Sequence, residues 1–93
     1  MELFRVKVNN KYGFVDKDGN EVVPCKYNEA NDFCEGMARV LHHGYYGFID
    51  ETGSEVIPCQ YGIARNFSDG LAYTRNNGQK FYIDKAGCNV VEA

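Results

Sequence analysis

The chain has 93 residues, of which 44% are hydrophobic and 14% aromatic, and these values indicate one small globular domain, residues 1–93. The net charge is −3, and the basic residues are scattered along the chain rather than clustered. Both features argue against nucleic acid and against an anionic membrane as partners. No apolar run approaches the roughly 18 residues of a membrane-spanning helix, and the charged N-terminus is unlike a secretory signal, so we expect a cytoplasmic protein.

The first residues predict a strand and a tight turn. Residues 3–8 alternate between apolar and charged side chains, as a half-buried strand does. The apolar face of this strand consists of Phe4, Val6 and Val8. Arg5 and Lys7 lie on its other face, where their charges discourage pairing with a foreign strand. An asparagine pair at 9–10 then predicts the turn.

Two further strands and a connector follow. Residues 11–16 alternate again, and Gly19 in the next loop is placed to adopt a positive φ. Residues 21–23 predict a third strand that Pro24 ends, because proline cannot donate to the ladder. The segment 25–36 has apolar side chains at a spacing of three, which fits one helical turn or a bulged strand. We favour a loop-like connector whose aromatic rings fill the gap between units.

These elements return after 34 residues. Gly13 matches Gly47, since 47 − 13 = 34, and the stretch 12–25 returns as a whole at 46–59. A looser third copy lies at 81–91. A fixed period of this length is typical of repeat proteins. The domain is therefore divided into units of about 3–36, 37–70 and 71–93.

The predicted fold is all-β: tandem three-stranded antiparallel meanders of 34-residue period, stacked as an open, curved repeat array. One meander buries too little apolar surface to fold alone, so neighbouring units have to cover each other's apolar faces. A set of propeller-like blades is the alternative arrangement. Ordinary propellers have four or more blades, which favours the open array.

The repeated motif resembles that of the WG-repeat, or KWG-repeat, proteins. At 12–38 and 46–72 it reads Y-G-F-(V/I)-D-x-x-G-x-E-V-(V/I)-P-x-x-Y-x-x-A-x-x-F-x-(E/D)-G-(M/L)-A. The tryptophan that names the family is Tyr12 and Tyr46 here, and the third copy has Lys80-Phe81 in place of Tyr-Gly. The resemblance implies a β-rich repeat module from a mostly bacterial family, with no catalytic residues to carry over.

The four cysteines predict packing rather than chemistry. They are Cys25, Cys34, Cys59 and Cys88. No C-x₂-C pair is present, so zinc-ribbon spacing is absent, and we expect the thiols of Cys25 and Cys59 to be buried or half-buried and to pack as small hydrophobic groups. Redox chemistry at the repeat-equivalent Cys25 and Cys59 is the weaker alternative.

The histidines and the repeated aspartates also predict structural roles. His42-His43 predicts a polar turn rather than a metal site, because adjacent strand residues point to opposite faces. One aspartate recurs before each Gly hairpin, as Asp16, Asp50 and Asp84. These predict Asx-type turns rather than calcium ligands. We expect no catalytic residue, no metal and no cofactor.

Tyrosines are the best binding candidates. They are Tyr12, Tyr27, Tyr45, Tyr46 and Tyr61. Rows of aromatic rings can stack sugars or hold a cation, although packing between units explains the same pattern. We therefore predict a non-enzymatic β-repeat binding module that mediates protein–protein interaction through its extended surface. Glycan, cell-wall or small-ligand binding through tyrosines exposed in register is the alternative.

Overall fold

The computed structural model describes residues 2–92, which form eleven strands. The first sheet and the strand that opens the second are β1 (Phe4–Val8), β2 (Lys11–Val15), β3 (Glu21–Tyr27) and β4 (Glu29–Ala30). The middle strands are β5 (Met37–His42), β6 (Tyr45–Asp50) and β7 (Glu55–Tyr61). The last strands are β8 (Ile63–Ala64), β9 (Ala72–Asn76), β10 (Gln79–Ile83) and β11 (Asn89–Glu92). Within 2–92, no helix is long and apolar enough to cross a membrane.

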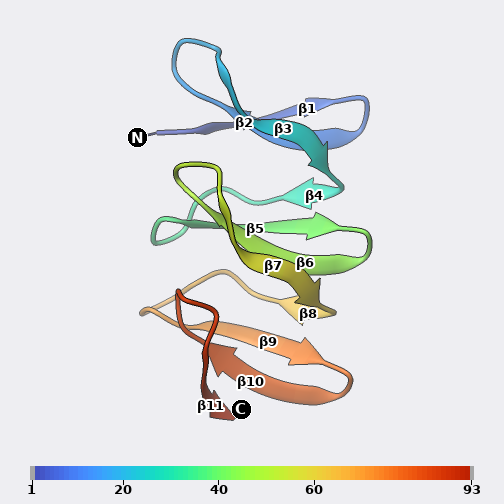
Figure 1. Ribbon diagram of the computed structural model, residues 1–93, viewed down its shortest axis with the longest axis vertical. Coiled ribbons are helices and arrows are strands. Elements are labelled where there is room, and N and C mark those ends of the chain that lie inside the picture. Colours follow the sequence, from blue (N-terminus) through green and yellow to red (C-terminus); the bar gives the residue numbers. More distant parts are fainter. Residues whose placement is uncertain (1, 93) are drawn as a thin grey trace.

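The strands form three separate antiparallel sheets that follow one another along the molecule (Figure 1). Their orders are β1-β2-β3, β4-β5-β6-β7 and β8-β9-β10-β11, and none closes on itself. The tight hairpin turns lie on the right-hand edge of Figure 1, and the turns before β3, β7 and β11 lie on the left. The predicted all-β fold, an open stack of sheets with a 34-residue period, is confirmed.

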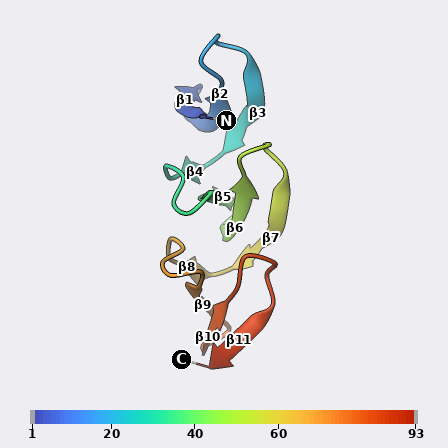
Figure 2. The same ribbon diagram turned by 90° about the vertical axis from the view of Figure 1, so that its left-hand side faces the viewer.

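The cores of the protein lie between neighbouring sheets rather than inside any one of them. The sheets succeed each other along the 41 Å axis of a slab that measures 41 × 25 × 15 Å (Figure 2). Phe48 and Ile49 are neighbours on β6 and both are fully buried, because their side chains enter different cores. The middle sheet is therefore covered on both faces, which explains why one meander alone is insufficient.

The two cores are built from equivalent repeat positions. The first contains Phe14, Val23, Tyr27 and Ala30 from the first unit, packed on Ala38, Val40 and Ile49 of the second. The second contains Phe48, Ile57, Tyr61, Ala64 and Phe67, packed on Ala72 and Ile83 of the third. One buried repeat position differs in polarity: it is the apolar Val40 in the second unit and the polar Thr74 in the third. The buried Thr74 hydroxyl donates a hydrogen bond to the Phe81 carbonyl at 2.9 Å, so its burial leaves no unsatisfied group.

The prediction that Pro24 ends the third strand is wrong. β3 and β7 continue past their prolines because each strand bulges there. Between the paired positions Tyr46↔Tyr61 and Phe48↔Ile57, one residue of β6 lies opposite three residues of β7. Proline is tolerated at such a bulge, since the ladder is interrupted in any case.

The bulge explains the glycine of the repeated Tyr-Gly pair. A Cβ built on Gly47 would lie 2.5 Å from the Ile57 carbonyl oxygen and 2.7 Å from the Cys59 nitrogen. Gly13 has the same environment in the first unit. In the third unit this position is Phe81, which pairs directly with Glu92 of β11, and the register shift between these strands lies at the next step, between Tyr82 and Ile83.

The connectors are more ordered than the sequence predicts. Each begins with a two-residue strand, β4 or β8, that pairs with the first long strand of the next sheet. Each then ends in a tight turn whose flanking residues form an isolated bridge, Cys34↔Met37 and Ser68↔Leu71. Hydrogen bonding therefore assigns residues up to Tyr27 or Tyr61 to one sheet and the residues that follow to the next sheet. The aromatic rings of Phe33 and Phe67 fill the gap between neighbouring units, as predicted.

The prediction of a half-buried first strand holds only in part. Val6 is half-buried, but Phe4 is 45% exposed and Val8 is 54% exposed. The same face of β5 carries Ala38 and Val40, which are fully buried because the first sheet covers them. No sheet of the described chain covers this face of β1. Its apolar and charged residues therefore alternate as predicted, but Phe4 and Val8 on the apolar face are exposed.

Candidate functional site

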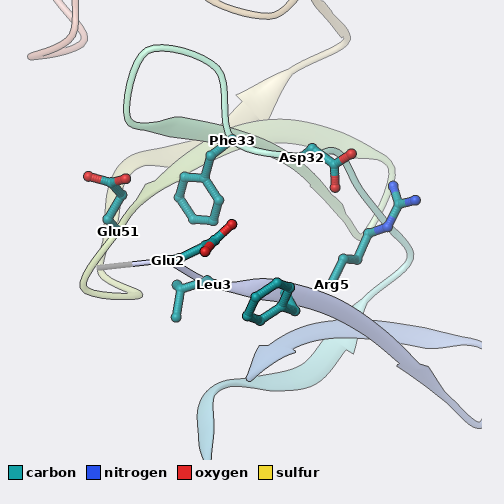
Figure 3. A pocket seen from close by; sticks show the side chains of 7 residues that line it. Glu2, Leu3, Arg5, Asp32, Phe33 and Glu51 are labelled. Carbon is teal, nitrogen blue, oxygen red and sulfur yellow. The ribbon is translucent and has the colours of Figure 1, made fainter. Parts of the chain in front are cut away.

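A groove opens at the margin of the first interface between units. It has a volume of about 430 Å³ and lies between the start of β1, the connector after β4 and the turn after β6 (Figure 3). Its lining residues are Glu2, Leu3, Phe4, Arg5, Asp32, Phe33 and Glu51. They are brought together only by the stacking of the first two units, because they come from three separate stretches of the chain.

The walls of the groove combine apolar surface with a fixed arginine. Leu3 and Phe33 both pack against the first core and remain half-buried. The Arg5 guanidinium donates a hydrogen bond from Nη1 to the Ala30 carbonyl at 2.7 Å and lies 5.5 Å from the centre of the Tyr12 ring. These contacts hold the Arg5 guanidinium against β4 and the Tyr12 ring at the edge of the groove.

Three acidic residues line this space: in Figure 3 Glu2 lies in its middle, and Glu51 and Asp32 lie at its two ends. All three residues are exposed, and among residues 2–92 no hydrogen bond or salt bridge engages their carboxylate oxygens. Among residues 2–92, three acidic residues and one basic residue, Arg5, line the groove, so the formal charge of this lining is −3 + 1 = −2. An apolar wall beside free carboxylates suits the stem and the head of a lysine or arginine side chain.

The second interface is filled differently at the same repeat positions. Asp32 becomes Asn66 and Glu51 becomes Lys85, while Leu3 becomes Met37, which is 5% exposed. The Lys85 ammonium lies 3.7 Å from the Glu35 carboxylate, which also accepts hydrogen bonds from the amides of Asp69 and Gly70 at 2.6 and 2.8 Å. These amides and Lys85 lower the pKa of Glu35. Among the described residues, a lysine therefore pairs with a carboxylate at the second interface, whereas no salt bridge forms at the first.

The structure does not gather the five candidate tyrosines into one row. Tyr27 and Tyr61 are 1% and 4% exposed and belong to the cores, so their ring faces cannot stack a ligand. Tyr12 and Tyr46 are half-buried, and each ring lies beside the arginine of its own unit, Arg5 or Arg39. Only Tyr45, 50% exposed at the start of β6, presents a free ring. Tyrosines exposed in register are therefore not found.

Tyr27 anchors a polar network across the first interface. Its hydroxyl donates a hydrogen bond to the Glu55 carboxylate at 3.0 Å, and the second carboxylate oxygen accepts one from the Cys59 amide at 3.2 Å. Burial, followed by the hydrogen bond to Glu55, raises the pKa of Tyr27. Burial, followed by the Glu55 charge, raises the pKa of the Cys59 thiol to about 11. A thiol that stays protonated at neutral pH is a poor nucleophile, which argues against redox chemistry at Cys59.

The histidine pair forms the turn that the sequence predicts, with a different ring arrangement. Strand alternation ends at His42, and the positive φ of His43 turns the second ring back toward the first. The ring centres lie 3.9 Å apart, so the expectation of opposite faces is wrong. Burial, then the His43 charge, lowers the pKa of His42. In the described part of the chain, no group of three or more His, Cys, Asp or Glu side chains could hold a metal ion.

The repeated aspartates form the predicted Asx turns. Asp50 Oδ1 accepts hydrogen bonds from the amides of Thr52 and Ser54 at 2.9 and 3.2 Å. Asp16 and Asp84 accept from the amides two and four residues ahead in the same way. Hydrogen bonds, from Asn20 to Asp16 and from Thr52 to Asp50, lower the pKa of both carboxylates. All four cysteines are free thiols, of which Cys25, Cys34 and Cys59 are half-buried and Cys88 is exposed.

Sequence reasoning missed the role of the paired arginines. Arg39 repeats the Arg5 contact, with Nη1 donating to the Ala64 carbonyl at 2.6 Å, and its Nη2 donates to Asn31 Oδ1 at 3.1 Å. Each arginine therefore ties its unit to the connector that follows. The signal was available, because Arg5 and Arg39 are 34 residues apart, as are the tyrosines beside them.

Comparison with known proteins supports the repeat assignment. The family described as WG containing repeat matches the chain twice, over residues 12–46 and 46–79. These matches cover well over half of the chain and follow the period seen in the sheets. No curated protein and no solved structure matches the sequence.

Proposed function

We propose that this chain, which belongs to the family of WG-containing repeats, is a non-enzymatic module that binds another protein through the groove of its first interface. The groove receives a lysine or arginine side chain of the partner. Its apolar wall of Leu3 and Phe33 contacts the aliphatic stem, and the carboxylate of Glu51, at one end of the groove, pairs with the charged head.

The observation that carries the proposal is the difference between the two interfaces. Both are built from the same repeat positions, yet Lys85 stands in the second interface where Glu51 stands in the first. The second interface satisfies its carboxylate with this lysine. The first leaves three carboxylates and an apolar wall open at its margin. A basic side chain from outside would complete the first interface as Lys85 completes the second.

Capture from a lysate of the encoding organism tests the proposal. Glu51→Lys introduces at the groove the lysine that the third unit carries at the same repeat position, Lys85. We expect this variant to lose retention of the partner, because the new cation repels the partner's basic side chain. Glu29→Lys makes the same charge change on β4, outside the groove, and should retain the partner as the unchanged chain does. Circular dichroism establishes that both variants are folded.

The captured protein is then changed in turn. Replacing the lysine or arginine of its binding segment with methionine should release it, because the stem is kept while the charge is lost. If Glu51→Lys retains the same proteins as the unchanged chain, or if nothing is retained by any form, the groove is not the binding site.

A further inference from the structure

A second cavity lies on the opposite edge of the molecule, between the hairpins of the second and third units. It has a volume of about 360 Å³, within the range of roughly 300–1,000 Å³ that is usual for small-molecule sites. Its lining residues are Tyr45, Cys59, Gln60, Asn76 and Asn77. We call this cavity the hairpin notch. It shares no lining residue with the groove described above.

The hairpin notch is lined by neutral groups. Tyr45 contributes the one freely exposed ring of the five candidate tyrosines. Gln60, Asn76 and Asn77 contribute side-chain amides, each with donors and an acceptor. The Cys59 thiol is uncharged, and burial raises its pKa to about 11, further above neutral pH than that of an ordinary thiol. Among residues 2–92, no charged residue lines the notch, so the described lining offers no ion-pair partner to a ligand.

The first interface provides an internal comparison. The residues at the same repeat positions are Lys11, Cys25, Lys26, His42 and His43. The backbone of the two hairpins is equivalent, but tyrosine and three amides replace two lysines and two histidines. The second interface alone therefore combines a flat aromatic ring with neutral hydrogen-bonding groups.

We propose that the hairpin notch between Tyr45, Gln60 and the Asn76-Asn77 turn binds a ring of a neutral saccharide. The C–H face of the sugar lies on the exposed Tyr45 ring, which is apolar on its face and polar at its tip. The amides of Gln60, Asn76 and Asn77 exchange hydrogen bonds with the hydroxyl groups. Gln60 already donates one hydrogen bond to the Tyr61 hydroxyl at 3.3 Å, which fixes its side chain next to the notch.

Nuclear magnetic resonance titration of the ¹⁵N-labelled chain tests this site. The probes are four soluble oligosaccharides, namely cellotetraose, chitotetraose, maltotetraose and mannotetraose, with the acyclic polyol sorbitol as a control. Because the notch is shallow, we expect a dissociation constant in the millimolar range for at least one oligosaccharide. The shifted amides should be those of Tyr45 and the Asn76-Asn77 turn, and sorbitol should not shift them.

Matched variants identify the aromatic platform. Tyr45→Ser should weaken binding at least tenfold, whereas Lys11→Ser, at the same position of the first unit, should leave it unchanged. The inference is overturned if no probe shifts the notch amides, if sorbitol shifts them as a sugar does, or if Tyr45→Ser binds as tightly as the unchanged chain.

Discussion

Gly47→Ala lowers the free energy of unfolding by about 3 kcal/mol or more, which is a large part of the roughly 5–15 kcal/mol that stabilises a domain. The added methyl group would lie 2.5 to 2.8 Å from backbone atoms of Ile57, Pro58 and Cys59. These atoms all belong to β7, whose backbone cannot move away without breaking its pairing with β6 at the centre of the stack. Thermal unfolding followed by circular dichroism measures the effect.

Gly62→Ala is the matched control for this substitution. Gly62 is exposed, its φ is not left-handed, and a Cβ there would have only the Arg75 carbonyl oxygen within reach, at 3.7 Å. We expect this variant to melt within a few degrees of the unchanged chain. Equal melting temperatures for Gly47→Ala and Gly62→Ala would show that the bulge does not press on the glycine.

Phe48→Ala costs about 3–5 kcal/mol, since it removes a fully buried aromatic side chain from the second core. The ring of Phe48 packs edge-to-face against Phe67 of the connector, with the centres 4.8 Å apart. Its loss leaves a cavity between the second and third units that the connector cannot fill. Chemical denaturation at fixed temperature measures the change in the free energy of unfolding.

Tyr82 occupies the same repeat position in the third unit and provides the comparison. It is only half-buried, because no further sheet of the described chain covers it. We expect Tyr82→Ala to cost less than half as much as Phe48→Ala. If the two variants lose the same stability, the cores do not reside between the sheets, and the stacked account of the fold fails.

The period of the sequence was enough to predict the main features of the fold. Alternation within each unit indicates strands, and Gly19 with Asp16 indicates the hairpin that the structure contains. The strand that runs past Pro24 was missed because a bulge depends on the partner strand, which local sequence does not describe. The two-residue strands β4 and β8 were missed because they are shorter than any periodic signal.

The candidate sites were harder to predict than the fold. The period correctly pairs Tyr27 with Tyr61 but cannot say that both rings are buried, since burial depends on how closely the sheets stack. The groove combines Glu2, Asp32 and Glu51 from two units and a connector. Only the three-dimensional arrangement brings them together. Comparing each residue with its partner 34 positions away would have exposed the change from Glu51 to Lys85.

The two proposed surfaces lie on opposite edges of the slab. The groove belongs to the edge that carries the turns before β3 and β7, and the hairpin notch belongs to the edge of the tight hairpins (Figure 1). Either edge can therefore be altered without touching the other. Loss of protein binding in Glu51→Lys and loss of saccharide binding in Tyr45→Ser are separable results, so failure of one proposal leaves the other standing.

Selection from a library of displayed random peptides is the measurement that tests the central claim most directly. The unchanged chain is the target, and Glu51→Lys serves for counter-selection. The account predicts enriched peptides that share a lysine or arginine next to an apolar residue, bind Glu29→Lys normally and weaken as salt concentration rises. Enrichment of peptides without a basic residue, or of peptides that bind Glu51→Lys equally well, would contradict it.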